Sequence, residues 1–212
     1  MRIDVYADIA CPWCYIGERR LEAAIQQRPD VEIVRHWRPF QLQPDLPAQG
    51  IPWNEFVPQK FGSIERATQM FAQVARAGKP DDIDFRFDRV ATAANTGDAH
   101  RLILYAGEQN REWEMAEALF RAYFTEGRDL NSIDTLVEIA TSVGIAEDNV
   151  RRLFATTMYS SEVEGSQELA GQLGVQGVPF FVIDERYGLS GAQPVEVLLQ
   201  AIDQVSEEKV SD

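Results

Sequence analysis

Two cysteines separated by two residues, Cys11 and Cys14, stand between a short alternating run and a helical pattern. The thiolate is the reactive form of cysteine, and the unpaired N–H groups and dipole of a helix N-terminus stabilise negative charge. Cys11 lies at that predicted N-terminus, where we expect it to be accessible to solvent. Pro12 suits the first helical position because its missing N–H costs nothing there. The spacing therefore predicts redox chemistry in which Cys11 is the nucleophile and Cys14 resolves a mixed disulfide.

Other interpretations of the pair are a structural disulfide, half of a zinc site or two inert core thiols. A zinc site would need further ligands, and the chain contains no third cysteine. His36 and His100 lack the spacing of zinc ligands. We therefore expect no metal centre and interpret the pair as a dithiol that cycles.

The composition narrows the class of partner. The 212 residues are 45% hydrophobic, enough to bury a core, and carry 34 acidic against 20 basic side chains. The formal net charge of -14 disfavours nucleic acid and anionic membranes as partners. No apolar run approaches the length of a membrane span, and no apolar secretory core follows Met1. We expect a cytoplasmic protein, and the reducing thiols there favour a cycling dithiol over a structural disulfide.

A strand and a helix would position the cysteine pair. Residues 3–9 place an apolar side chain at every second position, which indicates a strand that ends at the cysteines. From Pro12 onward, spacings of three and four residues predict a helix that ends near Pro29. Residues 31–37 are rich in β-branched and aromatic side chains and indicate a second strand. Together these segments predict a right-handed βαβ unit.

Glu18 is the one acidic residue on the predicted inner face of that helix, which it shares with Cys14 and Leu21. Burial there would raise the pKa of its carboxyl group and suit it for proton transfer beside Cys14. The alternative is that Glu18 points to solvent or pairs with an arginine. The arginines considered for that pairing are Arg2, Arg19 and Arg20.

The middle of the chain changes to a helical period. Its amphipathic patterns predict helices at residues 64–77, 99–109, 113–124, 133–143 and 149–156. Residues 83–87 alternate between these helices and are expected to be extended. No polar linker flanks the block. We therefore predict an all-helical insertion domain at residues 41–164 within an α/β domain formed by residues 1–40 and 165–212.

Strand patterns return near the C-terminus. Residues 180–184 predict a buried strand, 186–190 its hairpin partner and 195–205 a closing helix. Pro179 comes directly before the first of these strands. Because only about 5–6% of X-Pro bonds are cis in folded proteins, the residues alone favour a trans turn at this proline.

Several motifs, taken together, resemble one known family. The sequence Cys-Pro-Trp-Cys at residues 11–14, a long helical interruption and Gly-Val-Pro-Phe at residues 177–180 resemble the DsbA family, in particular its cytoplasmic FrnE-like branch. The finer resemblance rests on Asp8 and on residues 11–17, 37–40, 95–96, 99–102 and 190–194. It implies an α/β, thioredoxin-like fold with a large all-helical insertion domain.

The resemblance also implies roles around the cysteines. Pro179 would be cis and would face the Cys11 sulfur, and the backbone of Val178 would offer an edge to a thiol-bearing peptide. Pro12 and Trp13 would support the site from between the two cysteines.

Three further residues match positions near the active site of such relatives. They are Asp8, Asn95 and His100, for which the resemblance suggests contact with substrate. The alternative for Asn95 is helix capping, and for His100 it is polar packing.

The activity implied is that of a thiol-disulfide oxidoreductase acting on protein or small-thiol substrates. Its partners would be a disulfide- or thiol-containing substrate and a cellular thiol reductant, with no nucleic acid and no membrane. No tightly bound cofactor is implied, and glutathione or another low-molecular-weight thiol could serve as co-substrate.

Two alternatives belong to other functional classes. Kappa-class glutathione transferases and 2-hydroxychromene-2-carboxylate isomerases resemble the chain but use serine where it has Cys11, which counts against either activity. For such an enzyme, Trp53, Phe56 and Phe61 would form an apolar pocket under a helical lid. The other alternative is a chaperone or adaptor that holds partners between the domains.

Overall fold

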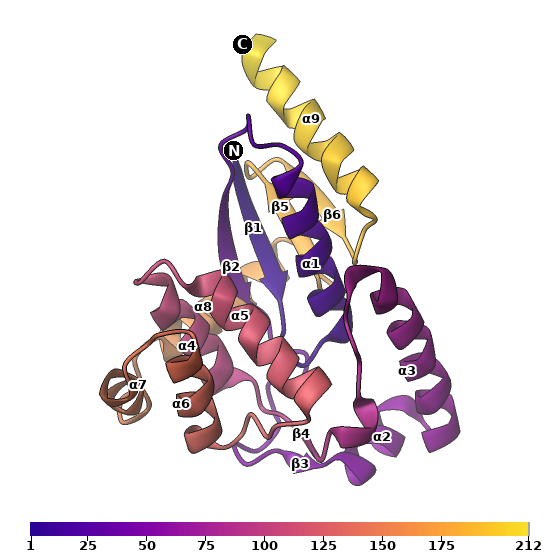
Figure 1. Ribbon diagram of the computed structural model, residues 1–212, viewed down its shortest axis with the longest axis vertical. Coiled ribbons are helices and arrows are strands. Elements are labelled where there is room, and N and C mark those ends of the chain that lie inside the picture. The colour runs from indigo at the N-terminus through magenta and orange to yellow at the C-terminus, as the bar shows by residue number, and fades with distance from the viewer. Residues whose placement is uncertain (212) are drawn as a thin grey trace.

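The fold is organised around one strand at the centre of a four-stranded sheet (Figure 1). The computed structural model describes the backbone of residues 1–211 and the side chains of residues 1–208. The strands are β1 (Arg2–Ala7), β2 (Val34–Pro39), β5 (Phe180–Ile183) and β6 (Tyr187–Ser190). β1 pairs in parallel with β2 and antiparallel with β5, and β6 extends the sheet beyond β5. The order β2-β1-β5-β6 therefore joins the two ends of the chain.

Helices cover both faces of this sheet. α1 (Pro12–Gln26) connects β1 to β2, and α9 (Val195–Ser211) packs beside it, as Figure 1 shows. α8 (Ser160–Gln172) packs against β2 and covers the other face of β1. α1 and α9 thus lie side by side and share the main core with the sheet.

The central strand is buried on both of its faces. Val5 lies in the main core with α1, whereas Tyr6 packs with residues of α8 and its C-terminal turn. Asp4 is also buried, and it forms ion pairs with Arg2 at 2.9 Å and Arg38 at 2.7 Å. The alternating sequence is therefore a correct sign of a strand, although helix α8 covers the face that carries its polar side chains.

The remaining helices come from the middle of the chain and occupy the lower half of Figure 1. They are α2 (Trp53–Phe61), α3 (Ile64–Gly78), α4 (Gly97–Gly107), α5 (Glu112–Arg121), α6 (Ile133–Ser142) and α7 (Glu147–Phe154). A π-helical turn, Ala122–Glu126, continues α5, and β3 (Ile51–Pro52) pairs with β4 (Thr92–Ala93). α8 crosses the predicted boundary at 164–165 and packs on both α4 and β2. The division into domains stays a prediction.

Two segments differ from their prediction. The second strand begins at Val34 and not at residue 31, because a turn closed by Val31 N–H and the Arg28 carbonyl comes first. Residues 83–87 form no strand. Their backbone pairs instead with the π-helical turn, where Arg86 N–H donates to a carbonyl oxygen at 2.7 Å.

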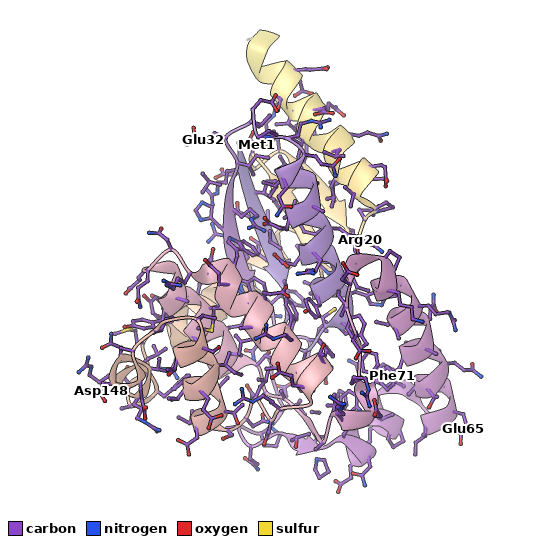
Figure 2. The ribbon with its side chains drawn as sticks, viewed as in Figure 1. Met1, Arg20, Glu32, Glu65, Phe71 and Asp148 are labelled. Carbon is purple, nitrogen blue, oxygen red and sulfur yellow. The ribbon has the colours of Figure 1, made fainter. Side chains whose placement is uncertain are left out.

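Arg20 of α1 links this helix to two other segments of the chain. Figure 2 labels it between α1 and α3. Its guanidinium donates to the Asp81 carboxylate at 2.9 Å and to the carbonyl oxygens of Ala77 and Ala192 at 3.2 and 2.9 Å. One side chain on the active-site helix therefore holds the end of α3 and the segment after β6.

Gly17 of α1 lies so close to β5 that any larger residue would clash. A Cβ atom at this position would lie 2.8 Å from Pro179 Cγ and 3.3 Å from Phe181 Cζ. We therefore expect Gly17→Ala to lower the free energy of unfolding by about 1–3 kcal/mol through overpacking. Urea denaturation measures the change. The matched control is Gly165→Ala in α8, whose Cβ would have no neighbour within 4 Å. Equal stability of the two variants would contradict this prediction.

Candidate active site

The cysteine turn joins the end of β1 to the start of α1. Cys11 is the N-cap of the helix, with φ -100° and ψ 111°, and Pro12 follows in the first turn. The Cys11 N–H donates to the Asp8 carbonyl at 3.0 Å, and the Cys14 N–H donates to the Cys11 carbonyl at 3.0 Å. The sequence therefore correctly predicted that Cys11 lies at the helix N-terminus.

The loop before β5 lies against the Cys11 sulfur. The Val178–Pro179 peptide bond is cis, as the family resemblance implies and contrary to the expectation from the residues alone. The Cys11 Sγ donates to the Val178 carbonyl oxygen at 3.5 Å. Segments that are far apart in sequence thus meet at the sulfur.

Both cysteines are present as thiols, and both are buried. Only 5% of Cys11 and 1% of Cys14 is exposed, so the expected solvent access of Cys11 is wrong in this structure. Burial first, and then the hydrogen bond and charge of Cys11, raise the pKa of the Cys14 thiol well above its usual value. Cys14 is therefore held in its neutral form at physiological pH.

Asp8 is a buried carboxylate directly behind the cysteine turn. Its side-chain oxygens accept the Ala10 N–H at 3.2 Å and the Leu42 N–H at 2.7 Å. Its negative charge also contributes to the raised pKa of Cys14. Asp8 is 1% exposed and therefore presents no surface to a substrate in this structure.

His100 of α4 lies behind Asp8 and is fully buried. The Trp37 indole N–H donates to His100 Nδ1 at 3.1 Å, so the neutral ring carries its proton on Nε2. Nε2 lies 3.4 Å from Asp8 Oδ1, although this contact lacks hydrogen-bond geometry. The structure thus brings Asp8 and His100 together behind the site, and a direct contact between His100 and substrate has no exposed surface to support it.

Asn95 lies away from the cysteines and holds two loops. Its side chain donates to the Leu46 carbonyl at 2.6 Å, and its Oδ1 accepts the Gly97 N–H at 3.0 Å at the start of α4. It lines a separate polar hollow together with Asp98 and Arg101. Asn95 thus bonds the first N–H of α4, although the N-cap residue is Thr96, and a contact between Asn95 and substrate stays a prediction.

Glu18 is buried as its place on the helix predicts, with 6% of it exposed. Its partner is Arg35 of β2 at 3.3 Å, and not one of the three arginines considered from the sequence. Arg35 also pairs with Glu22 at 2.6 Å and lies 4.3 Å from the centre of the Trp113 ring. Burial raises the pKa of Glu18 to about 7, and the charge of Arg35 opposes this rise. A role of Glu18 in proton transfer stays a prediction.

The raised pKa of Glu18 makes the stability of the protein depend on pH. The usual pKa of a glutamate in an unfolded chain is about 4.3, so the folded state holds the proton more tightly. The stabilisation is complete below that value and is lost as pH rises through about 7. Between pH 4 and pH 8 the loss is about 3 kcal/mol, at 1.36 kcal/mol per pKa unit.

We expect Glu18→Gln to remove this loss of stability, because glutamine carries no proton that titrates. The measurement is urea denaturation of wild type and variant across that pH range. Glu22→Gln is the control, since Glu22 shares Arg35 but is more exposed. A wild type and a Glu18→Gln variant with equal pH slopes would show that the carboxyl group is not held in its neutral form.

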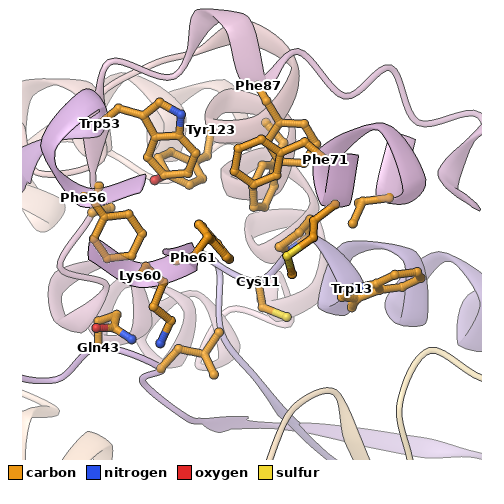
Figure 3. Close-up of a pocket in the computed structure, with 18 of the residues that line it drawn as sticks. Cys11, Trp13, Gln43, Trp53, Phe56, Lys60, Phe61, Phe71, Phe87 and Tyr123 are labelled. Carbon is orange, nitrogen blue, oxygen red and sulfur yellow. The ribbon is translucent and has the colours of Figure 1, made fainter. Parts of the chain in front are cut away.

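An apolar cavity of about 200 Å³ opens beside the cysteine turn (Figure 3). Trp53, Phe56 and Phe61 line it, as proposed from the sequence for an apolar pocket. Cys11 lies at its edge in Figure 3, and Lys60 lies at another edge. The cavity therefore connects Cys11 to the aromatic side chains of α2.

The described residues offer neither a metal site nor a membrane span. Among them, no group of three or more histidine, cysteine, aspartate or glutamate side chains is arranged to hold a metal ion. No helix in the described part of the chain combines the length and the apolar character that crossing a membrane requires.

Comparison with known proteins extends these observations. A family model described as a DSBA-like thioredoxin domain matches residues 2–203. A probable DsbA oxidoreductase from Streptomyces coelicolor is 35% identical, with a TM-score of 0.89 over 98% of this chain and 91% of that chain.

Two more distant structures share the fold. The cytosolic disulfide reductase DsbM from Pseudomonas aeruginosa, solved with GSH, is 20% identical, with a TM-score of 0.67 over 97% of this chain and 100% of that chain. A 2-hydroxychromene-2-carboxylate isomerase is 15% identical, with a TM-score of 0.75 over 100% of this chain and 98% of that chain. The predicted thioredoxin-like fold is confirmed, and the chain belongs to the family of DSBA-like thioredoxin domains.

Proposed function

We propose that the protein is a thiol-disulfide oxidoreductase in which Cys11 is the nucleophile and Cys14 the resolving thiol. The observation that carries this proposal is the asymmetry of the pair. Cys11 is the N-cap of α1, lies against the Val178 carbonyl and borders the cavity. Cys14 is buried one turn into the helix and has a raised pKa. Cys11 is thus placed to attack a substrate disulfide, whereas Cys14 stays protonated until the second step.

The reaction follows from these two positions. The Cys11 thiolate attacks one sulfur of a substrate disulfide, the S–S bond breaks, and the first thiolate leaves with the electron pair. Cys14 then loses its proton and attacks the Cys11 sulfur, so that the second substrate thiolate leaves. The cysteine pair loses two electrons and the substrate gains them. Run in reverse, the same steps oxidise a dithiol substrate.

A low-molecular-weight thiol is the proposed reductant that restores the dithiol. Glutathione is the first candidate, because DsbM, which shares the fold, was solved with GSH. We propose a cytoplasmic location, since the reducing poise there keeps a cycling pair supplied with electrons. No tightly bound cofactor takes part in the proposed steps.

The second candidate is a glutathione-dependent transferase or isomerase. The apolar cavity beside Cys11 favours it, and so does the fold shared with a 2-hydroxychromene-2-carboxylate isomerase. The cysteine at position 11, where the resemblance expects serine in such enzymes, argues against it. A chaperone or adaptor is the third candidate and needs neither cysteine.

One set of assays separates the three candidates. Wild type is expected to reduce the disulfides of insulin with glutathione and glutathione reductase as the electron supply, measured by NADPH consumption. Glutathione conjugation of 1-chloro-2,4-dinitrobenzene without disulfide turnover would favour the transferase. Suppression of aggregation that persists in the Cys11→Ser, Cys14→Ser double variant, with no turnover in wild type, would favour the chaperone.

A further inference from the structure

We propose that the cavity beside Cys11 binds the flat, apolar half of a small organic disulfide, so that the preferred substrates are low-molecular-weight aryl disulfides with an anionic group. This inference rests on the proposed exchange chemistry and adds the substrate class. It follows from the access to Cys11, the nature of the cavity walls and the charge at the cavity edge.

Access to the nucleophile is narrow. Cys11 is 5% exposed, and the Val178 carbonyl lies 3.5 Å from its sulfur. Cys11 is itself one of the residues that line the cavity, together with Pro12 and Trp13. A substrate sulfur reaches Cys11 through this space, and a thin ligand enters it more readily than the surface of a folded protein. The volume of about 200 Å³ lies below the ~300–1,000 Å³ typical of drug-sized ligand pockets.

The walls of the cavity are aromatic and flat. The Trp53 ring stacks on Phe56 and on Phe71, both at 5.7 Å between centroids, and Phe71 stacks on Phe87 at 4.4 Å. Figure 3 shows these rings around the open space, and Figure 2 labels Phe71 on α3. Stacking against such rings adds to the favourable free energy of burying apolar area. The cavity therefore favours a planar ring over an aliphatic chain.

The walls offer little to a polar ligand. Tyr123 lines the cavity, but its hydroxyl already donates to the Thr92 carbonyl at 3.1 Å. Gln43, like Lys60, lines the cavity with a side chain that offers polar groups, and it lies at the edge of the cavity in Figure 3. A peptide-like ligand would leave most of its amide groups without partners along the aromatic walls, and burying such groups unpaired is unfavourable. The aromatic part of the cavity therefore favours an apolar group.

One positive charge marks the edge of the cavity. Among the described residues that line it, Lys60 alone is charged. Lys60 also lies in the last turn of α2, where its positive charge interacts favourably with the helix dipole and stabilises the helix. The chain as a whole carries a formal net charge of -14, which repels anions elsewhere. A carboxylate on the ligand therefore has one favourable place, beside Lys60.

The chemistry is the proposed exchange applied to this ligand. The Cys11 thiolate attacks the nearer sulfur of the aryl disulfide, the S–S bond breaks, and one arylthiolate leaves with the electron pair. Cys14 loses its proton to solvent, attacks the Cys11 sulfur and releases the second arylthiolate. The cysteine pair is oxidised by two electrons, and two molecules of glutathione then return two electrons to it and leave as glutathione disulfide.

The first test measures binding without catalysis. The probe is 2-naphthoate, which is flat, anionic and free of sulfur, titrated calorimetrically into wild type and variants. We expect Phe56→Ala to weaken binding about tenfold and Lys60→Gln about threefold, because the first removes an aromatic ring of the cavity and the second removes its positive charge. The matched controls are Phe154→Ala in α7 and Lys79→Gln, neither of which lines the cavity. Phe61→Ala provides a second aromatic variant in case Phe56→Ala fails to fold.

The second test measures turnover and identifies which proposal fails. The ratio of kcat/KM for 4,4'-dithiodibenzoate to that for 2-hydroxyethyl disulfide is expected to fall about tenfold in Phe56→Ala and to stay constant in Phe154→Ala. Taking the ratio of variant to wild type cancels the different intrinsic reactivities of the two disulfides. The proposed substrate class is wrong if the ratio is unchanged in Phe56→Ala, or if wild type and Phe56→Ala bind naphthoate equally well. Neither result contradicts the exchange activity.

Two further outcomes are also decisive. If wild type reduces neither disulfide but binds naphthoate with the expected dependence on Phe56, the proposed exchange activity is wrong. The proposal that the cavity binds a flat, apolar group with an anionic substituent is then supported. If Phe56→Ala lowers kcat/KM only for cysteine peptides that carry a neighbouring tryptophan, the cavity takes a side chain of a polypeptide, and the assignment to small disulfides is wrong.

Discussion

Replacing Cys11 with serine is expected to abolish disulfide reduction. The thiolate is the nucleophile, and a serine hydroxyl stays protonated at the same helix N-terminus, so we expect kcat/KM to fall by at least about 10³-fold. Cys14 cannot take over, because it is 1% exposed and the pKa of its thiol is raised well above the usual value. The measurement is the reduction of insulin with glutathione as the electron source.

The stability of the Cys11→Ser variant is the control for that experiment. Serine nearly matches cysteine in shape, and a hydroxyl can also donate the hydrogen bond that Cys11 Sγ makes to the Val178 carbonyl. Urea denaturation should therefore show a variant close to wild type in stability. Full activity in a stable Cys11→Ser protein would refute Cys11 as the nucleophile and with it the proposed mechanism.

Replacing Cys14 with serine is expected to have the opposite signature, in which the reaction stops halfway. Cys11 can still attack and form a mixed disulfide, but no second thiol lies beside it to release the bound substrate thiol. A non-reducing gel should therefore show a substrate adduct that accumulates in Cys14→Ser and disappears on addition of dithiothreitol.

The order of the two steps makes this result specific. No adduct should form in Cys11→Ser or in the double variant, because both lack the attacking sulfur. An adduct that forms on Cys14 in the Cys11→Ser protein would reverse the assigned roles. Adduct in neither single variant, with turnover intact in wild type, would require a mechanism that does not pass through a mixed disulfide.

Local sequence patterns were sufficient where a local rule decides the structure. The position of Cys11 at the helix N-terminus follows from the strand pattern, Pro12 and the helical period that begins there. Glu18 is buried, which is one of the two alternatives that the same period left open. The cis state of Pro179 did not follow from the residues, because only the family resemblance implied it.

Contacts between distant elements were not predictable in the same way. Glu18 pairs with Arg35, which lies on β2, and the sequence does not show which residue of the second strand faces the helix. The hydrogen bond from Trp37 to His100 likewise joins β2 to α4. Arg35 and Trp37 both belong to the predicted second strand, so the composition of residues 31–37 indicated their element but not their partners.

The low exposure of Cys11 was not predictable either, because it depends on a contact between distant elements. A pattern along β1 and α1 predicts the turn but not what covers it. The cover comes from the loop before β5, whose Val178 carbonyl lies 3.5 Å from the sulfur. The site is thus assembled from segments that no local pattern connects.

The central position of β1 has a consequence for how the protein is made. β1 ends at Ala7 and is synthesised well before its antiparallel partner β5, which begins at Phe180. At roughly 5–20 residues per second, about 10–35 s separate the two strands during translation. Until β5 arrives, β1 keeps one edge unpaired and neither thiol is covered by the Val178 loop. The growing chain therefore carries two cysteines that the Val178 loop does not cover until β5 is made, and both thiols reach their full burial only when the last strands join the sheet.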